Sequence, residues 1–235
     1  MGKNKLRRFA EMKEFSCVFE PVKADVVDDN FGLKGKWHAD YFRNENPLVV
    51  ELGCGKGEYT VALAKKYPER NFVGVDVKGA RIWRGSKTVE EEEIENAAFV
   101  RTKIEFINSI FDRNEVSEIW LTFSDPQPKD KRGTKRLSGQ AFLKRYGKLL
   151  KKEGVIHVKT DSVLLYESTL ETIQEGHHHL IVETDDLYGA GWKKFSEEDK
   201  EILSIKTFYE QKWLSEGKSI HYIRFALNDR YHKDI

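Results

Sequence analysis

A glycine-rich segment follows the first strongly apolar run of the chain and has the composition of a ligand-binding loop. The run Leu48–Leu52 leads into Gly53, Gly55 and Gly57. Glycines permit positive φ angles and let a ligand approach the backbone closely. Their G-x-G-x-G spacing differs from the G-x-G-x-x-G spacing of dinucleotide-binding loops. We therefore expect a strand, a tight turn and a helix with a ligand against the turn, although an unliganded strand-to-helix turn is an alternative.

Two carboxylates near this loop indicate the kind of ligand. Glu51 precedes the first glycine by two residues, and Asp76 ends the second apolar run, Asn71–Val75. A carboxylate at Glu51 would repel a pyrophosphate but attract the cationic amino-acid end of S-adenosylmethionine. An acid in the position of Asp76 typically accepts hydrogen bonds from ribose hydroxyls. Together they favour a nucleoside cofactor that carries positive charge and no phosphate, with NAD as the weaker alternative.

A second candidate site follows the β-rich run Ser117–Phe123. Asp125 is held there by the turn Pro126-Gln127-Pro128, because two prolines stiffen the chain. Five cations and one acid then lie within eight residues; the cations are Lys129, Lys131, Arg132, Lys135 and Arg136. Clustered cations beside a ligand cleft predict contact with phosphates, whereas a solvated charge run is the alternative.

Two other groups of reactive residues are not interpreted as a catalytic nucleophile or a metal site. Cys54 lies in the glycine loop, but no nearby histidine would activate it, so we interpret it as a small residue that fits the turn. His177, His178 and His179 begin a predicted strand, where successive side chains point to opposite faces. Three adjacent histidines cannot easily chelate one ion in this arrangement, and no metal site is expected.

Strands alternate with helices along the chain after residue 46. The apolar patterns predict strands at residues 48–52, 71–75, 97–101, 117–123, 154–159, 180–184 and 219–227. They predict helices at residues 57–66, 78–95, 162–174 and around 207–214, and one that Ser138 caps and that runs to about Lys152. This order indicates an α/β fold with a doubly wound, mainly parallel sheet and helices on both faces. Residues 1–46 are interpreted as a basic N-terminal extension and residues 47–235 as a single domain.

Composition limits the class of protein. The chain has 235 residues, of which 39% are hydrophobic and 12% aromatic, as in a globular domain. The net charge is only +1 although 34% of residues are charged, so local charge clusters matter more than the sum. Apolar runs stay well below the roughly 18 residues of a membrane span, and no apolar stretch follows the basic N-terminus. With only two cysteines, these features predict a cytoplasmic protein without a membrane partner.

The motifs taken together carry a family resemblance. E-L-G-C-G-K-G, V-G-V-D, F-S-D-P-Q-P-K, K-R-x-L, H-V-K-T-D and T-F-Y-E follow one another between residues 51 and 210. In this order they resemble the bacterial tRNA (guanine-N7-)-methyltransferase (TrmB) family. The resemblance implies a class I, Rossmann-like methyltransferase fold, S-adenosylmethionine as donor, and N7 of a guanine in the tRNA variable loop as acceptor. It favours neither a monomer nor a homodimer.

The resemblance also implies roles for matching residues, with Asp125 as the catalytic group. The cofactor-binding positions are Glu51, Gly53, Gly55, Gly57, Asp76, Lys103 and Asp125. The substrate-binding positions are Lys129, Asp161, Thr207, Phe208, Tyr209 and Glu210. The positions expected at the RNA backbone are Lys131, Arg132, Lys135 and Arg136.

Two positions depart from the family pattern. Lys103 stands where the family usually has Asp or Asn against the cofactor adenine, so a backbone N–H or Glu105 would substitute. Gln127 replaces the aromatic residue of the family's D-P-W-P motif.

The implied chemistry needs little from acid–base groups. Guanine N7 has an in-plane lone pair and no proton, so catalysis consists mainly of alignment. A carboxylate such as Asp125 would stabilise the positive charge that develops on guanine, and Asp161 and Glu210 are candidates to accept the N1–H and N2–H donors. Alternatives are transfer to another RNA or base position, or a non-catalytic RNA-binding module with a vestigial cofactor site. An adenine amino-group methylase is disfavoured because Gln127 supplies no stacking ring.

Overall fold

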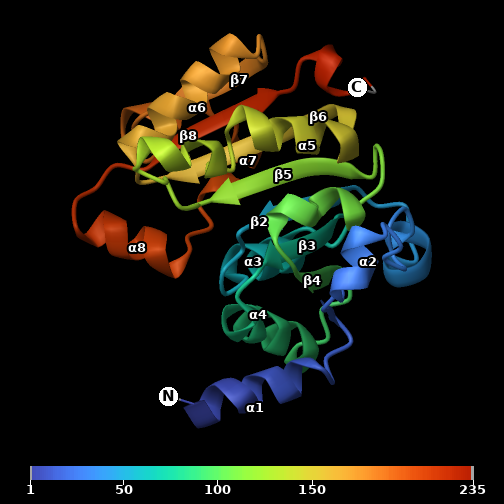
Figure 1. The fold of residues 1–235 in the computed structure, drawn as a ribbon. Helices are drawn as coiled ribbons and strands as arrows, with labels where there is room; N and C mark the ends of the chain where they lie inside the picture. Colours follow the sequence, from blue (N-terminus) through green and yellow to red (C-terminus); the bar gives the residue numbers. More distant parts are fainter. Residues whose placement is uncertain (1, 234–235) are drawn as a thin grey trace. The chain divides into compact units, whose positions relative to one another are not determined.

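The structure is a computed structural model that describes residues 2–233, with the side chains of residues 5–129 and 133–233. The chain divides into two compact units, residues 1–116 and 117–235. The first runs from blue to green in Figure 1 and the second from green to red.

The first unit contains a parallel sheet in the order β1-β4-β3-β2. Its strands are β1 (Val18–Phe19), β2 (Leu48–Leu52), β3 (Asn71–Asp76) and β4 (Ala97–Arg101). Every residue of β2 and β3 is buried, as expected of parallel strands covered on both faces. The strands predicted at residues 48–52, 71–75 and 97–101 are confirmed.

The glycine loop and helices α3 (Glu58–Lys66) and α4 (Gly79–Glu91) lie on one face of this sheet. The Phe99 ring lies on that face. A Cβ atom added to Gly57 would come within 2.5 Å of this ring, and one added to Gly85 within 2.7 Å. An aromatic cluster covers the other face. There Phe19, whose register partner is Val100, meets the fully buried Trp37 edge-on, with ring centroids 5.4 Å apart.

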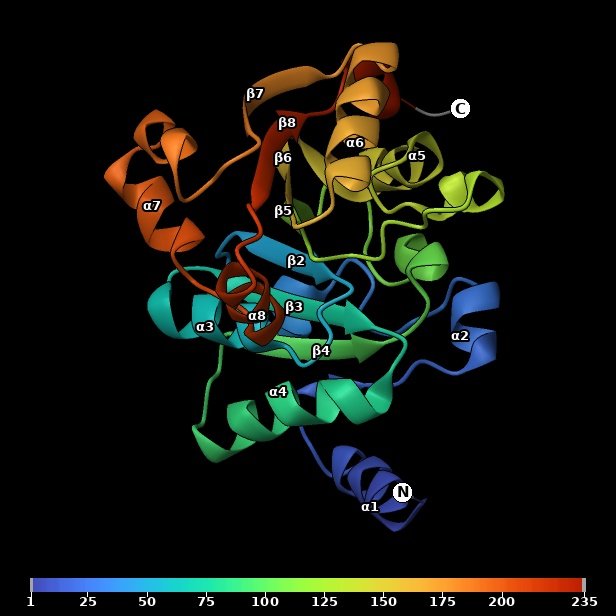
Figure 2. The ribbon, with the colours of Figure 1, turned by 90° about the vertical axis from the view of Figure 1, so that its left-hand side faces the viewer.

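The segment before residue 47 supplies part of this core. It forms α1 (Gly2–Met12), β1, α2 (Lys23–Val27) and one π-type turn, η1 (Trp37–Phe42). Helix α1 lies alongside α4 in both ribbon views (Figures 1 and 2), where Trp83 Nε1 donates to Glu11 Oε2 at 2.6 Å. The predicted basic extension therefore contributes a strand and aromatic packing to the first unit.

The second unit contains strands in the order β5-β6-β8-β7. They are β5 (Val116–Thr122), β6 (Leu150–Thr160), β7 (His179–Thr184) and β8 (His221–Ala226). Strand β8 runs antiparallel to both neighbours, and Thr160 is the register partner of His221. Its helices are α5 (Gln140–Leu149), α6 (Val163–Glu175), α7 (Glu197–Leu203) and α8 (Phe208–Ser215), with short 3-10 turns η3 (Asp130–Lys135), η4 (Ala190–Lys194) and η5 (Asp229–Tyr231).

Alternation along β8 places helices on both faces of this sheet. His221 stacks on Tyr166 of α6, with ring centroids 5.0 Å apart. The next residue, Tyr222, points to the opposite face, and Arg224 pairs there with Asp199 of α7 at 2.6 Å. Figure 2 shows α6 and α7 on opposite sides of these strands.

The predicted helix 138–152 is wrong at both ends. Gly139 is the N-cap of α5, and the Ser138 hydroxyl hydrogen-bonds to Thr169 Oγ1 of α6 at 2.6 Å instead of capping its own helix. The helix ends at Leu149, and β6 begins at Leu150, four residues before the predicted start. The charged residues that follow Leu150 fit a helix face and an exposed strand equally well, so their pattern does not locate this boundary.

Candidate cofactor and substrate sites

The glycine loop of the first unit has the backbone that its sequence predicts. Gly53, Gly55 and Gly57 have φ angles of 80°, 58° and 70°, a region that side chains rarely adopt. The Val75 carbonyl accepts from the N–H groups of Gly53 at 2.8 Å and Cys54 at 3.2 Å. These bonds fix the loop against the carboxyl end of β3.

One side of this loop is open to a ligand. A Cβ atom on Gly57 would overlap Phe99, but one on Gly55 would meet only the Gly53 carbonyl oxygen, at 4.0 Å. Since Gly57 is also the N-cap of α3, the positive end of that helix begins directly behind the loop. The loop is therefore closed toward the core and open at Gly55.

Both predicted cofactor carboxylates are tied to this loop. Asp76 accepts from the N–H groups of Gly55 at 3.0 Å and Lys78 at 2.8 Å. Glu51 is 4% exposed, and its Oε2 accepts from Thr60 N at 3.0 Å and from the Thr60 hydroxyl in the first turn of α3. The structure thus brings the two acids to one loop, where each also holds local backbone.

Cys54, within the glycine loop, is buried, whereas Lys103, the remaining predicted cofactor residue of this unit, is exposed. Burial, followed by the charges of Glu51 and Asp76, raises the pKa of the Cys54 thiol well above its usual value. A protonated, buried thiol is a poor nucleophile, in agreement with its interpretation as a packing residue. Lys103 is exposed and precedes η2 (Ile104–Ser109), just beyond the carboxyl end of β4.

The second unit holds the predicted Asp125 loop in a defined turn. Asp125 is exposed, and its Oδ1 accepts from Gln127 N at 2.9 Å. Gln127 has a φ of 46°, so this turn is strained for a residue with a side chain. Arg136 closes the loop from its other end, because its guanidinium donates to the carbonyls of Pro126 at 3.0 Å and Gln127 at 3.4 Å.

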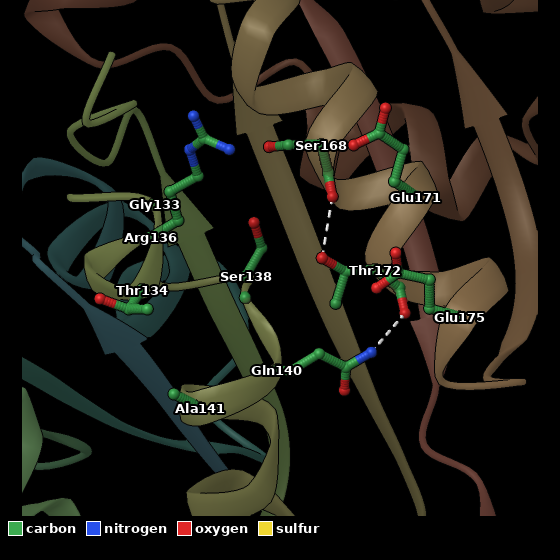
Figure 3. Close-up of a pocket in the computed structure, with 11 residues that line it drawn as sticks. Gly133, Thr134, Arg136, Ser138, Gln140, Ala141, Ser168, Glu171, Thr172 and Glu175 are labelled. Atoms are coloured by element: carbon green, nitrogen blue, oxygen red, sulfur yellow. Dashed lines mark hydrogen bonds between the residues drawn. The ribbon is translucent and has the colours of Figure 1, made fainter. Parts of the chain in front are cut away.

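The basic run that follows this turn is only partly described. Lys129 and Lys135 are exposed, whereas the side chains of Lys131 and Arg132 lie outside the described residues. Figure 3 shows Arg136 beside a cavity of about 240 Å³ between η3, α5 and α6. Gln140 of α5 crosses one side of this cavity and donates to the Thr172 carbonyl at 3.0 Å.

The predicted substrate residues at the start of α8 differ in exposure: Phe208 and Tyr209 are exposed, whereas Glu210 is buried. Phe208 and Tyr209 are 55% and 43% exposed. Thr207 is the N-cap, and it exchanges backbone-to-side-chain hydrogen bonds with Glu210 in a capping box. Glu210 has no exposed surface, so it could contact a substrate only after α8 moved.

Asp161 follows β6 and lies in a separate charged contact. Its Oδ2 is 3.4 Å from Lys218 Nζ, which also lies 3.5 Å from the centre of the Trp213 ring. Asp161 is only partly buried, so its carboxylate remains accessible in this contact.

The partner of Glu210 is Lys159, a residue of the H-V-K-T-D motif for which the sequence predicted no role. Lys159 Nζ lies 2.7 Å from Glu210 Oε1, and neither side chain is exposed. Burial lowers the pKa of Lys159 to about 8, while the Glu210 charge opposes this shift. The signal that could have pointed to it is the position of a lysine within the strand run I-H-V-K-T, all five residues of which are buried.

The comparisons with known proteins agree with these features. A family model described as putative methyltransferase matches residues 45–223. The chain is 49% identical to the tRNA (guanine-N(7)-)-methyltransferase of Christiangramia forsetii, over 96% of this chain and 99% of that protein. The chain belongs to the tRNA (guanine-N(7)-)-methyltransferase family. Proteins of the same name from Bacteroides fragilis and Cytophaga hutchinsonii are 48% and 39% identical, over 97% and 96% of this chain and 87% and 98% of theirs.

Solved structures show the fold of this family member. An antibiotic-related methyltransferase is 13% identical with a TM-score of 0.59, covering 84% of this chain and 95% of its own. The 16S rRNA methyltransferase KamB is also 13% identical with a TM-score of 0.59, covering 81% and 92%. The predicted Rossmann-like methyltransferase fold is confirmed.

Two features are absent from the described residues. No helix among them is long and apolar enough to cross a membrane. Within the same part of the chain, no three His, Cys, Asp or Glu side chains lie close enough to hold a metal ion.

The Glu51 carboxylate is predicted to contribute charge to cofactor binding. Glu51→Gln keeps the shape and an acceptor for Thr60 but removes the charge. We expect affinity for S-adenosylmethionine to fall by about 1–3 kcal/mol, the scale of a charge-assisted hydrogen bond. Thr60→Val is the matched control, because it removes a donor to Glu51 and leaves the charge. Calorimetry that gives equal affinities for Glu51→Gln and the wild type would remove Glu51 from the cofactor site.

In the basic loop, Arg136 is predicted to hold the turn as well as contact RNA, whereas Lys135 is predicted to contact RNA alone. Arg136→Ala removes the donors to the Pro126 and Gln127 carbonyls, so the rate of methyl transfer should fall even at saturating tRNA. Lys135→Ala should weaken only tRNA binding and reduce its salt dependence by up to about one unit of slope. Salt titrations and single-turnover rates separate the two effects. Identical behaviour of both variants would argue against a holding role for Arg136.

Proposed function

We propose that this protein transfers the methyl group of S-adenosylmethionine to N7 of a guanine in the variable loop of tRNA. The observation that carries the proposal is 49% identity to a named tRNA (guanine-N(7)-)-methyltransferase across nearly all of both chains. The glycine loop with its two acids supports the cofactor, and the basic run from Lys129 to Arg136 supports an RNA substrate. A tRNA substrate agrees with a cytoplasmic location.

The first unit fits S-adenosylmethionine in both shape and charge. The open side at Gly55 admits a ligand, and the acids Glu51 and Asp76 suit a cation with ribose hydroxyls. In this proposal Glu51 attracts the ammonium group, Asp76 accepts from the ribose, and the backbone N–H of Lys103 contacts the adenine. The bound cofactor supplies a methyl group activated by a positively charged sulfur.

The residues of the second unit act on the guanine. N7 has a lone pair and no proton, so they have to orient the base and stabilise charge, and no group has to remove a proton. Asp125 stabilises the positive charge that transfer places on guanine. Asp161 accepts from N1–H and N2–H, and the exposed rings of Phe208 and Tyr209 offer faces for stacking.

Cations along the loop bind the RNA backbone. In this proposal the phosphates are contacted by Lys129, Lys131, Arg132, Lys135 and Arg136. Arg136 combines this contact with its hydrogen bonds to the loop carbonyls.

The proposed reaction is tested by mapping the methylated base. Unmodified tRNA is incubated with the protein and labelled S-adenosylmethionine, and the tRNA chain is then cleaved chemically at 7-methylguanosine. We expect one label at a variable-loop guanine. Label at another base or in another RNA would support a different acceptor. Binding of both ligands without transfer would support a non-catalytic RNA-binding module.

Asp125 is predicted to act through its charge. Asp125→Asn keeps the acceptor for Gln127 N and should preserve the fold and most tRNA affinity. Single-turnover transfer at saturating cofactor and tRNA should fall by about 10²–10³, as on loss of one preorganised electrostatic group. Asp229→Asn, an exposed acid of the same unit, is the control. A near wild-type rate for Asp125→Asn would rule out this electrostatic mechanism.

A further inference from the structure

Helix α8 is anchored by a charged residue. All eight of its residues are described, and Glu210 alone is buried. Helices are normally held by a buried apolar stripe, but Phe208 and Tyr209 at the start of α8 are exposed, and Trp213 and Leu214 near its end are only half-buried. The position of α8 therefore depends on what holds the Glu210 carboxylate.

Lys159 holds that carboxylate and the chain that leads to it. Its ammonium group lies 2.7 Å from Glu210 Oε1 and donates to the carbonyls of Leu203 at 2.9 Å and Ile205 at 3.0 Å. These three oxygens match the three donors of an ammonium group. They lie at the end of α7, in the connection and in the first turn of α8, so one side chain fixes the path of residues 203–210.

Other polar groups around the pair complete the arrangement. The Tyr188 hydroxyl lies within hydrogen-bond distance of Leu203 O and Glu210 Oε1 and donates its one proton to either of them, and Lys206 Nζ lies 4.5 Å from the centre of the Tyr188 ring. A buried ion pair adds little net stability, because desolvation offsets its attraction, but its directional bonds can select one arrangement. Lys159 is itself placed by β6, two residues before Asp161.

We infer that Lys159 is a positioning residue: it holds α8 and residues 203–207 in the orientation in which Thr207, Phe208 and Tyr209 meet the tRNA. This inference rests on the proposed function and deepens it. Because Lys159 has no exposed surface, it offers no side-chain contact to a cofactor or RNA. Its contribution is to the geometry of the residues that do.

The test compares Lys159→Met with Lys159→Met/Glu210→Gln. The single variant leaves Glu210 buried without its cation, so α8 should leave its place. The double variant removes both charges and keeps a partner for Tyr188, so thermal stability should return toward wild type while the bonds to Leu203 and Ile205 stay lost. For both we expect the KM for tRNA to rise at least about tenfold, with S-adenosylmethionine affinity changed by less than about twofold. Lys200→Met is the control, because it breaks an exposed pair with Glu197 on the neighbouring helix.

Limited trypsin digestion gives a readout independent of methyl transfer. Cleavage after Lys206 and Lys212 should accelerate in both Lys159 variants and not in Lys200→Met. A folded Lys159 variant with wild-type KM and wild-type cleavage would overturn the inference. So would a double variant that regains stability together with wild-type KM, because Lys159 would then serve stability alone. If the wild type fails to methylate tRNA, the proposed function falls, and the digestion still tests whether Lys159 holds α8.

Discussion

The backbone of residues 53–57 is the constraint on which the rest of the first unit depends. Three positive φ angles turn the chain from β2 into α3, and the Val75 carbonyl and the Asp76 carboxylate hold that turn at the end of β3. Because the strands are parallel, their carboxyl ends share one edge of the sheet. The loop, Asp76 and Lys103 therefore meet there without any long-range signal beyond strand order.

Several residues of the candidate sites also hold local structure. Glu51 binds the first turn of α3, Asp76 binds the glycine loop, and Arg136 binds the carbonyls of its own loop. Such internal bonds lower the number of orientations that a side chain must give up when a ligand arrives. The same bonds mean that loss of activity in a variant does not by itself identify a ligand contact.

The sequence predicted the elements whose patterns are local and apolar. Strands β2 and β3 are uninterrupted buried runs, β4 is buried except for its last residue, and Ser162, the first residue of the predicted helix 162–174, is the N-cap of α6. Ser138 was misassigned because a hydroxyl one residue from a helix start can bind another helix equally well. The ion pair of Lys159 with Glu210 was not predictable, because it joins residues 51 positions apart through β6 and α8. Spacing rules describe neighbours on one element, and they carry no information about such pairs.

The ion pair of Lys159 with Glu210 holds α8, and it also determines which measurements in solution would detect the release of this helix. Denaturant sensitivity and the heat capacity of unfolding both scale with the apolar surface that becomes exposed. Detaching a helix whose one buried residue is a carboxylate exposes little such surface. Its opening would therefore change the denaturant m-value and the heat capacity of unfolding only slightly. The element that carries Phe208 and Tyr209 can thus exchange between docked and free forms while the cooperative unit beneath it appears unchanged.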